Sequence, residues 1–140
     1  MNAAAQPQLL LVGRILVGVL FLVAGIRKFM YTAGTVGYFA NLGLPAPELM
    51  LWLAIVIEVG GAILLIVGWQ AKWVSWLFIV FVVIATLLGH RFWEYDAAQY
   101  GNQLNHFLKN LAIIGGLLYV AVQGPGALSM DAKGAAAKAA

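Results

Sequence analysis

Four apolar stretches fill most of this chain, and each is close to the roughly 20 residues that cross the ~30 Å hydrocarbon core of a bilayer. They cover residues 9–29, 48–68, 72–92 and 104–122. Within lipid, every backbone polar group must find its hydrogen bond inside the protein, so helices are the only feasible structure for runs of this length. The sequence therefore predicts an all-α integral membrane protein with a bundle of four transmembrane helices.

The domain organisation follows from where these stretches end. Residues 1–123 are predicted to form the transmembrane domain, and residues 124–140 to be a disordered C-terminal tail, because Gly, Pro, Ala and Lys dominate that segment and cannot form a core. The first stretch is expected to remain as an uncleaved helix, since no Lys or Arg precedes it and Arg14 interrupts its apolar centre.

Composition excludes several classes of function. The net charge of +3 is small and scattered over the chain, so nucleic acid is not an expected partner. The chain has no cysteine, which excludes thiol–disulfide chemistry, thiolate metal sites and iron–sulfur clusters on its own residues. A redox role would need a bound cofactor or a partner protein.

Ionisable side chains within the apolar stretches are the strongest indication of a site. A charge near the bilayer centre costs ~2.5–3.5 kcal/mol on insertion scales, and it is usually paired or faces a cavity. Helical spacing places each such residue on a stripe of small residues, which favour close helix contact. The three stripes are Arg14, Gly18, Phe21, Gly25 and Lys28; Ala54, Glu58, Gly61, Leu65 and Gly68; and Asn105, Lys109, Ala112, Gly116 and Tyr119. We expect all three to face the bundle interior.

Within that interior, Arg14 is expected to pair with the Glu58 carboxylate, and Lys109 is the competing partner. The pair has two interpretations: a structural ion pair that fixes helix register, or one wall of a ligand pocket. The candidate ligand-binding residues are Arg14, Lys28, Glu58, His106, Lys109 and Asn110.

Other polar residues give weaker indications. His90 and His106 lie near one membrane face and are candidate metal or haem ligands, but their spacing matches no metal motif, so we predict no metal site and expect His106 to line a pocket mouth. Residues 31–46 are either a plain loop or a short interfacial or re-entrant segment. Ser75 and Thr86 have no base at a spacing that indicates nucleophilic catalysis, and no catalytic residue is assigned.

Three motifs in this order resemble the DoxX family of small four-helix membrane proteins. They are G-R-I-L-V-G-V-L-F-L-V-A-G-I-R-K-F from residue 13, E-V-G-G-A-I-L-L-I-V-G-W from residue 58, and N-H-F-L-K-N-L-A-I-I-G-G-L-L from residue 105. The resemblance implies a bacterial inner-membrane protein with both termini in the cytoplasm. It places the family's recurring polar positions at Arg14, Lys28, Glu58, Lys109 and Asn110. Some members are membrane subunits of oxidoreductase systems, including thiosulfate:quinone oxidoreduction, or are linked to oxidative and quinone stress.

The leading functional hypothesis is a membrane subunit that binds a quinone or another small amphipathic ligand between the first, second and fourth helices. Arg14, Glu58 and Lys109 would then bind the polar oxygens of the ligand. Electron transfer would require a redox partner protein. The alternative is a non-enzymatic scaffold that anchors a partner, with contacts through residues 91–102 or 31–44. A small transporter is a third hypothesis, and it would require a homo-oligomer.

Overall fold

A computed structural model describes residues 6–139 of the chain, and the regular structure in this part is entirely helical. The elements, in chain order, are α1 (Gln6–Met30), α2 (Thr32–Asn41), α3 (Pro47–Ile55), the π-helical turn η2 (Val56–Gly60), α4 (Gly61–Val67), α5 (Ala71–Gly89), the 3-10 turn η3 (Phe92–Glu94), α6 (Ala97–Gln123) and α7 (Met130–Ala139).

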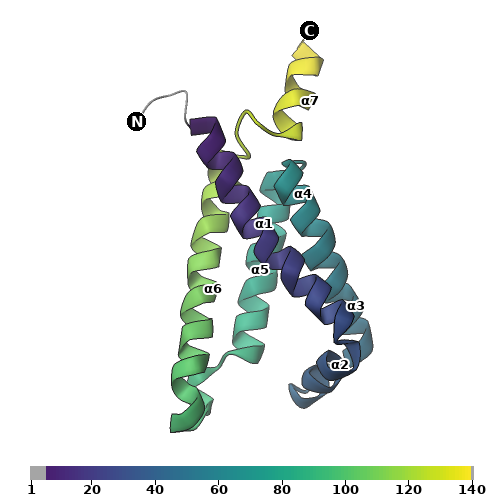
Figure 1. Cartoon of the computed structure of the whole chain (residues 1–140), viewed down its shortest axis with the longest axis vertical. Helices are drawn as coiled ribbons and strands as arrows, with labels where there is room; N and C mark the ends of the chain where they lie inside the picture. The colour runs from purple at the N-terminus through teal and green to yellow at the C-terminus, as the bar shows by residue number, and fades with distance from the viewer. Residues whose placement is uncertain (1–5, 140) are drawn as a thin grey trace.

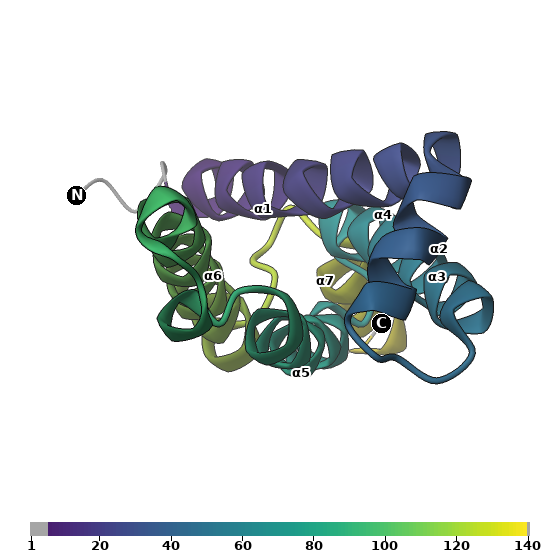
Figure 2. The same cartoon turned by 90° about the horizontal axis from the view of Figure 1, so that it is seen from below.

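Four of the helical segments are long and apolar enough to cross a membrane: α1, the continuous α3–η2–α4 unit, α5 and α6. They form the four-helix bundle that the sequence predicts. Figure 1 shows α7 beyond one end of this bundle, on the side where α1 begins, and α2 at the opposite end. Seen along the bundle in Figure 2, α1, α6, α5 and the α3–α4 unit surround a common interior, and α2 crosses beside α3.

Two of the three predicted interior stripes are confirmed. In α1 the buried residues are Arg14, Gly18, Phe21 and Gly25. In the α3–η2–α4 unit all five stripe residues, from Ala54 to Gly68, are buried. Small residues permit this contact: a Cβ on Gly25 would lie 2.7 Å from Val59 Cγ2, and one on Gly18 would collide with Ile66.

The stripe predicted for the fourth helix is wrong. In α6 the buried residues are Asn110, Leu117 and Ala121, whereas Asn105, Lys109, Ala112 and Tyr119 are exposed. The helix is rotated by about one residue from the orientation that would bury Lys109, since each residue turns an α-helix by about 100°. Its apolar residues, rather than its lysine, pack against α5.

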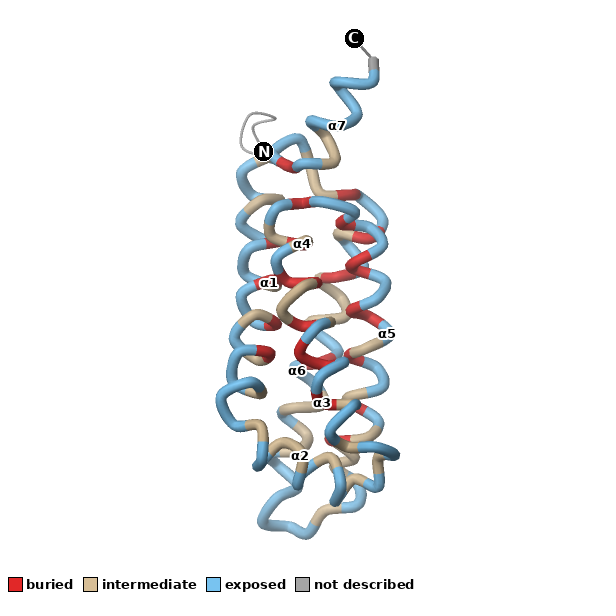
Figure 3. Tube along the Cα trace, turned by 90° about the vertical axis from the view of Figure 1, so that its right-hand side faces the viewer, coloured by how far each residue is buried: buried red, intermediate tan, exposed pale blue. Residues whose placement is uncertain are grey.

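The tightest packing lies in the middle of the bundle. Phe21 of α1 stacks on Phe78 of α5 with ring centroids 3.8 Å apart, and Leu65 and Leu117 are fully buried around them. Figure 3 shows the buried positions concentrated in the middle of the bundle and toward α4, while the end next to α2 is mostly intermediate or exposed. The bundle is therefore densely packed toward α7 and more open toward α2.

The fourth membrane helix begins earlier than predicted. The fourth apolar stretch of the sequence starts at residue 104, but α6 starts at Ala97. The Asp96 side chain caps this start by accepting a hydrogen bond from the Gln99 backbone N–H at 3.0 Å. A favourable N-cap thus extends the helix through polar residues, which a search for apolar membrane-spanning stretches does not include.

The C-terminal segment, which the sequence predicts to be a disordered tail, contacts the end of the bundle. The Arg14 guanidinium donates to the carbonyls of Pro125 at 2.5 Å and Leu128 at 2.8 Å, and α7 follows. The Asp131 carboxylate accepts from the backbone N–H groups of Gln70 and Ala71, at 2.8 and 3.1 Å, and so caps the start of α5. These contacts join the segment to α1 and α5.

Candidate functional site

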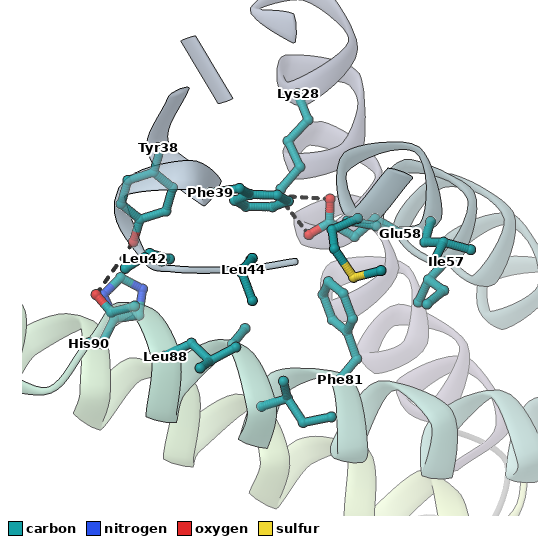
Figure 4. A pocket seen from close by; sticks show the side chains of 16 residues that line it. Lys28, Tyr38, Phe39, Leu42, Leu44, Ile57, Glu58, Phe81, Leu88 and His90 are labelled. Atoms are coloured by element: carbon teal, nitrogen blue, oxygen red, sulfur yellow. Dashed lines mark hydrogen bonds and ion pairs between the residues drawn. The ribbon is translucent and has the colours of Figure 1, made fainter. Parts of the chain in front are cut away.

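A cavity of about 370 Å³ lies at the more open end of the bundle, between α2, α3 and α5, with the end of α1 at its side. Its volume is in the range of small-ligand pockets, which are mostly apolar with a few polar groups. The walls are apolar, including Phe39, Leu44, Phe81 and Leu88. Figure 4 shows two polar positions across it: Lys28 with Glu58 on one side, and Tyr38 with His90 on the other.

Glu58 pairs with Lys28, and both predicted partners are wrong. The Lys28 Nζ donates to both carboxylate oxygens of Glu58, each at 2.8 Å. The Glu58 side chain is 5% exposed and that of Lys28 is 24% exposed. Arg14 is engaged with the C-terminal segment, and Lys109 lies exposed on α6.

The positions of Lys28 and Arg14 along α1 explain why Glu58 pairs with the lysine. Lys28 stands one turn beyond Gly25, the residue at which α1 comes closest to η2: a Cβ there would lie 3.1 Å from the Glu58 Cβ. Arg14 is 14 residues earlier on the same helix, or roughly 21 Å away at ~1.5 Å per residue. An arginine side chain does not extend that far. The close contact at Gly25 therefore brings the lysine, and not the arginine, to the carboxylate.

Glu58 also lies at an irregular point of its helix. It is the third residue of the π-helical turn Val56–Gly60 that joins α3 to α4. Single π-turns inside α-helices are rare, and they are frequent at functional sites because they shift side chains out of regular α-helical register. Here the turn directs the carboxylate to the cavity wall and to Lys28, while Gly61 just after it packs under the Phe78 ring.

The short helix α2 supplies a whole wall of the cavity. Tyr38, Phe39 and the following Leu42 and Leu44 line it. The Tyr38 hydroxyl donates to the Gly89 carbonyl of α5 at 3.5 Å, a long bond that is the direct polar link across the cavity mouth. Burial, and more weakly the neighbouring Tyr95, raises the pKa of the Tyr38 hydroxyl above its usual value. Tyr38 therefore stays a neutral donor.

The two histidines lie together at the end of the cavity opposite Glu58. His90 lines the cavity, and its ring stacks on His106 with centroids 4.8 Å apart and planes 22° apart. His90 Nδ1 contacts Gln103 Oε1 at 2.9 Å, and His106 Nδ1 contacts Lys109 Nζ at 3.2 Å. Among the described residues, no third His, Asp or Glu joins the pair in a group that could hold a metal.

The structure thus separates the six predicted ligand-binding residues. Lys28 and Glu58 line the cavity. His106 stacks on His90, and Lys109 contacts His106 on α6; neither of the two lines the cavity. Asn110 is buried between α6 and α5, where it donates to Thr86 Oγ1 at 2.8 Å and serves packing. Arg14 is outside the cavity, at the opposite end of α1.

Tyr38, His90 and the apolar residues of α2 were not among the predicted site residues. A signal for α2 was present, because Tyr38, Phe39 and Leu42 fall on one side of a helical turn. The glycines at 34 and 37 favoured a loop, however, and residues 31–46 were expected to be either a loop or an interfacial segment. The structure resolves this alternative in favour of a helix that folds back against α3.

Comparison with known proteins identifies the family of this chain. The family model for DoxX matches residues 9–91, more than half of the chain. The chain belongs to the DoxX family. The matched range includes nearly all of α1, and α2, the α3–η2–α4 unit and α5 with the segments between them, and every cavity-lining residue lies within it.

Relatives of this DoxX protein extend the match over nearly the whole chain. Inner membrane protein YphA of Escherichia coli is 40% identical over 128 residues, which cover 91% of this chain and 91% of YphA. Inner membrane protein YqjF of the same organism is 37% identical over 121 residues, covering 86% and 88% of the two chains. The ER-derived vesicles protein ERV29 of Saccharomyces cerevisiae is 26% identical over 132 residues, only 36% of its length. No solved structure matches the chain. The protein is a DoxX-family protein of the inner membrane with four membrane-spanning helices.

Proposed function

We propose that this DoxX protein binds a small, mostly apolar ligand with polar oxygens, of the quinone type, in the cavity between α2, α3 and α5. The observation that carries the proposal is the combination of a 370 Å³ apolar-walled space with the Lys28–Glu58 ion pair at its edge. A buried charge pair within a membrane helix bundle is costly to keep, and such groups commonly mark ligand or ion sites.

The proposed position differs from the one expected from the sequence. A site between the first, second and fourth helices would need Arg14 and Lys109, and neither lines the cavity. The cavity instead has α2 as one wall, so a ligand dissolved in lipid would reach it at the level of the interfacial helix. Apolar side chains would hold the ring, and Lys28, Glu58, Tyr38 and His90 would contact its polar atoms.

In this proposal the protein acts as the membrane subunit of an oxidoreductase or stress-response system. The chain has no cysteine, so electrons would have to come from or pass to a partner protein. The role of this chain would be to bind and orient the ligand and to supply proton-exchanging groups beside it.

The test is native mass spectrometry of the protein released gently from its own membrane at native expression. We expect a small-molecule adduct that is lost in Ala85→Phe, which fills the cavity, and that persists in Ala112→Phe, an equal change on an exposed position of α6. Glu58→Gln should also lose the adduct, whereas Glu94→Gln, in an exposed ion pair, should keep it.

Two results would contradict the proposal. An adduct that survives Ala85→Phe would be bound elsewhere on the protein. A chain that carries no small molecule but travels with a second protein in fixed ratio would instead support the scaffold hypothesis, and that partner would then define the function.

A further inference from the structure

Within residues 6–139, the His90 ring at the cavity has a hydrogen-bond partner for Nδ1 and none for Nε2. Gln103 Oε1 lies 2.9 Å from His90 Nδ1, and because an amide oxygen only accepts, Nδ1 carries the proton. A neutral imidazole protonated at Nδ1 has its lone pair on Nε2. Within residues 6–139, no hydrogen bond is made to His90 Nε2, and the ring lines the cavity.

His90 packs against His106 of α6. The two rings stack, and His106 Nδ1 faces the Lys109 ammonium at 3.2 Å. An ammonium only donates, so His106 Nδ1 is the acceptor in this contact.

The other charged and titratable groups near His90 are an ion pair and two tyrosines. Next to it in the chain, Arg91 is paired with Glu94 through Nε–Oε2 at 3.1 Å, so these two charges largely cancel. From α2, Tyr38 faces the same side of the cavity as a neutral hydroxyl bonded to the Gly89 carbonyl, and Tyr95 lies near Tyr38.

The opposite end of the cavity also has accepting capacity. The Glu58 carboxylate receives two bonds from Lys28, but its two oxygens offer about four lone-pair sites. The donors at the cavity are mostly engaged: two of the three Lys28 protons are directed at Glu58, and the Tyr38 hydroxyl is directed at Gly89. A ligand that donates hydrogen bonds at both ends therefore fits these groups better than one that only accepts.

We infer that the cavity selects the reduced, hydroquinone form of its ligand over the oxidised quinone, with one hydroxyl donating to His90 Nε2 and the other to the Glu58 carboxylate. This inference rests on the proposed function and specifies it. Figure 4 shows Glu58 and His90 on opposite sides of the apolar space, an arrangement that suits a ligand with a hydroxyl at each end of its ring. A quinone, with carbonyl oxygens alone, would leave His90 Nε2 unpaired beside another acceptor.

The experiment measures binding of two probes, a decyl-substituted benzoquinone and its hydroquinone, to the full chain in nanodiscs by anaerobic titration calorimetry. The absence of cysteine means that the reductant protecting the hydroquinone leaves the protein unchanged. One additional hydrogen bond corresponds to a preference of about three- to tenfold for the hydroquinone. His90→Phe should abolish that preference, because the acceptor for the second hydroxyl is then lost.

Two further variants separate the acceptor from the packing around it. His106→Phe keeps a ring in the stack and leaves His90 bound to Gln103, so the preference should persist. Gln103→Leu removes the group that fixes the tautomer without altering the cavity lining, so the preference should fall even if His90→Phe proves unstable.

Equal binding of both probes, tighter binding of the quinone, or a preference that survives His90→Phe would overturn this inference while leaving the proposed site in place. Failure of both probes to bind would overturn the inference together with the proposed function.

Discussion

The Lys28–Glu58 pair makes a prediction about stability that is asymmetric between its two members. Lys28→Met leaves a carboxylate that is 5% exposed without its countercharge, and breaking a buried pair in this way costs about 3–5 kcal/mol. We expect the lower end, about 3 kcal/mol, because the Lys28 side of the pair is 24% exposed and water can reach it. Glu58→Met should cost less, about 1 kcal/mol, since the lysine can extend its ammonium toward the surface.

The double variant Lys28→Met/Glu58→Met distinguishes the pair from two independent residues. With both charges replaced by apolar groups of similar volume, we expect stability close to that of the unmodified protein, since such replacements are often neutral or stabilising. The measurement is reversible unfolding in mixed micelles titrated with sodium dodecyl sulfate and followed by far-ultraviolet circular dichroism. Arg91→Met/Glu94→Met provides the matched control, because that pair is about half exposed and should couple by less than about 1 kcal/mol.

The reasoning would be refuted by additive effects, in which the double variant loses the sum of the two single losses. It would also be refuted if Glu58→Met were the more damaging of the two single changes. Either result would mean that the carboxylate is not held by Lys28 in the folded protein.

Two further predictions concern helix contact and the C-terminal segment. Gly25→Ala should destabilise the bundle by about 1–3 kcal/mol, because the new Cβ would lie 2.7 Å from Val59 Cγ2, whereas Gly115→Ala meets open space and should be neutral or slightly stabilising in the same unfolding titration. Arg14→Met should release the segment that follows Gln123, which limited proteolysis would detect as faster cleavage there, and unchanged cleavage would contradict the role of the guanidinium.

The buried face of a helix could be predicted from the sequence where its small residues and its ionisable group fall on the same stripe. In the first two membrane helices a single stripe combines small residues with one ionisable group, and that stripe is the buried one. The start of α6 is polar on several sides, with Asn105, His106, Lys109 and Asn110 close together. The choice of stripe then rested on the assumption that a charge faces inward. Lys109 lies in the middle of α6 but on its exposed side, with its ammonium against His106 one turn earlier, so the assumption failed.

The candidate site could be predicted only in part, because it depends on contacts distant in the sequence. Lys28 and Glu58 were both identified, but their pairing depends on how far α1 slides along the α3–η2–α4 unit, which the fit of Gly25 against Val59 determines. The cavity itself depends on α2 folding back over α3. The pattern of apolar residues within the ten residues of α2 does not indicate where that helix packs. The π-turn at Glu58 likewise lies within an otherwise regular apolar run.

Two basic groups of α1, the buried Arg14 and the partly buried Lys28, show what separates a structural charge from a functional one in a membrane bundle. Both lie on the same stripe and both donate hydrogen bonds, although the Arg14 Nε finds no partner among residues 6–139. Arg14 is 1% exposed and is surrounded by backbone carbonyls of Ile66, Pro125 and Leu128, which leave no space for a ligand. Lys28 is held by one carboxylate at the edge of an open volume, where a ligand could exchange hydrogen bonds with the pair. Burial alone would rank Arg14 first, whereas adjacency to free space assigns the site to Lys28 and Glu58.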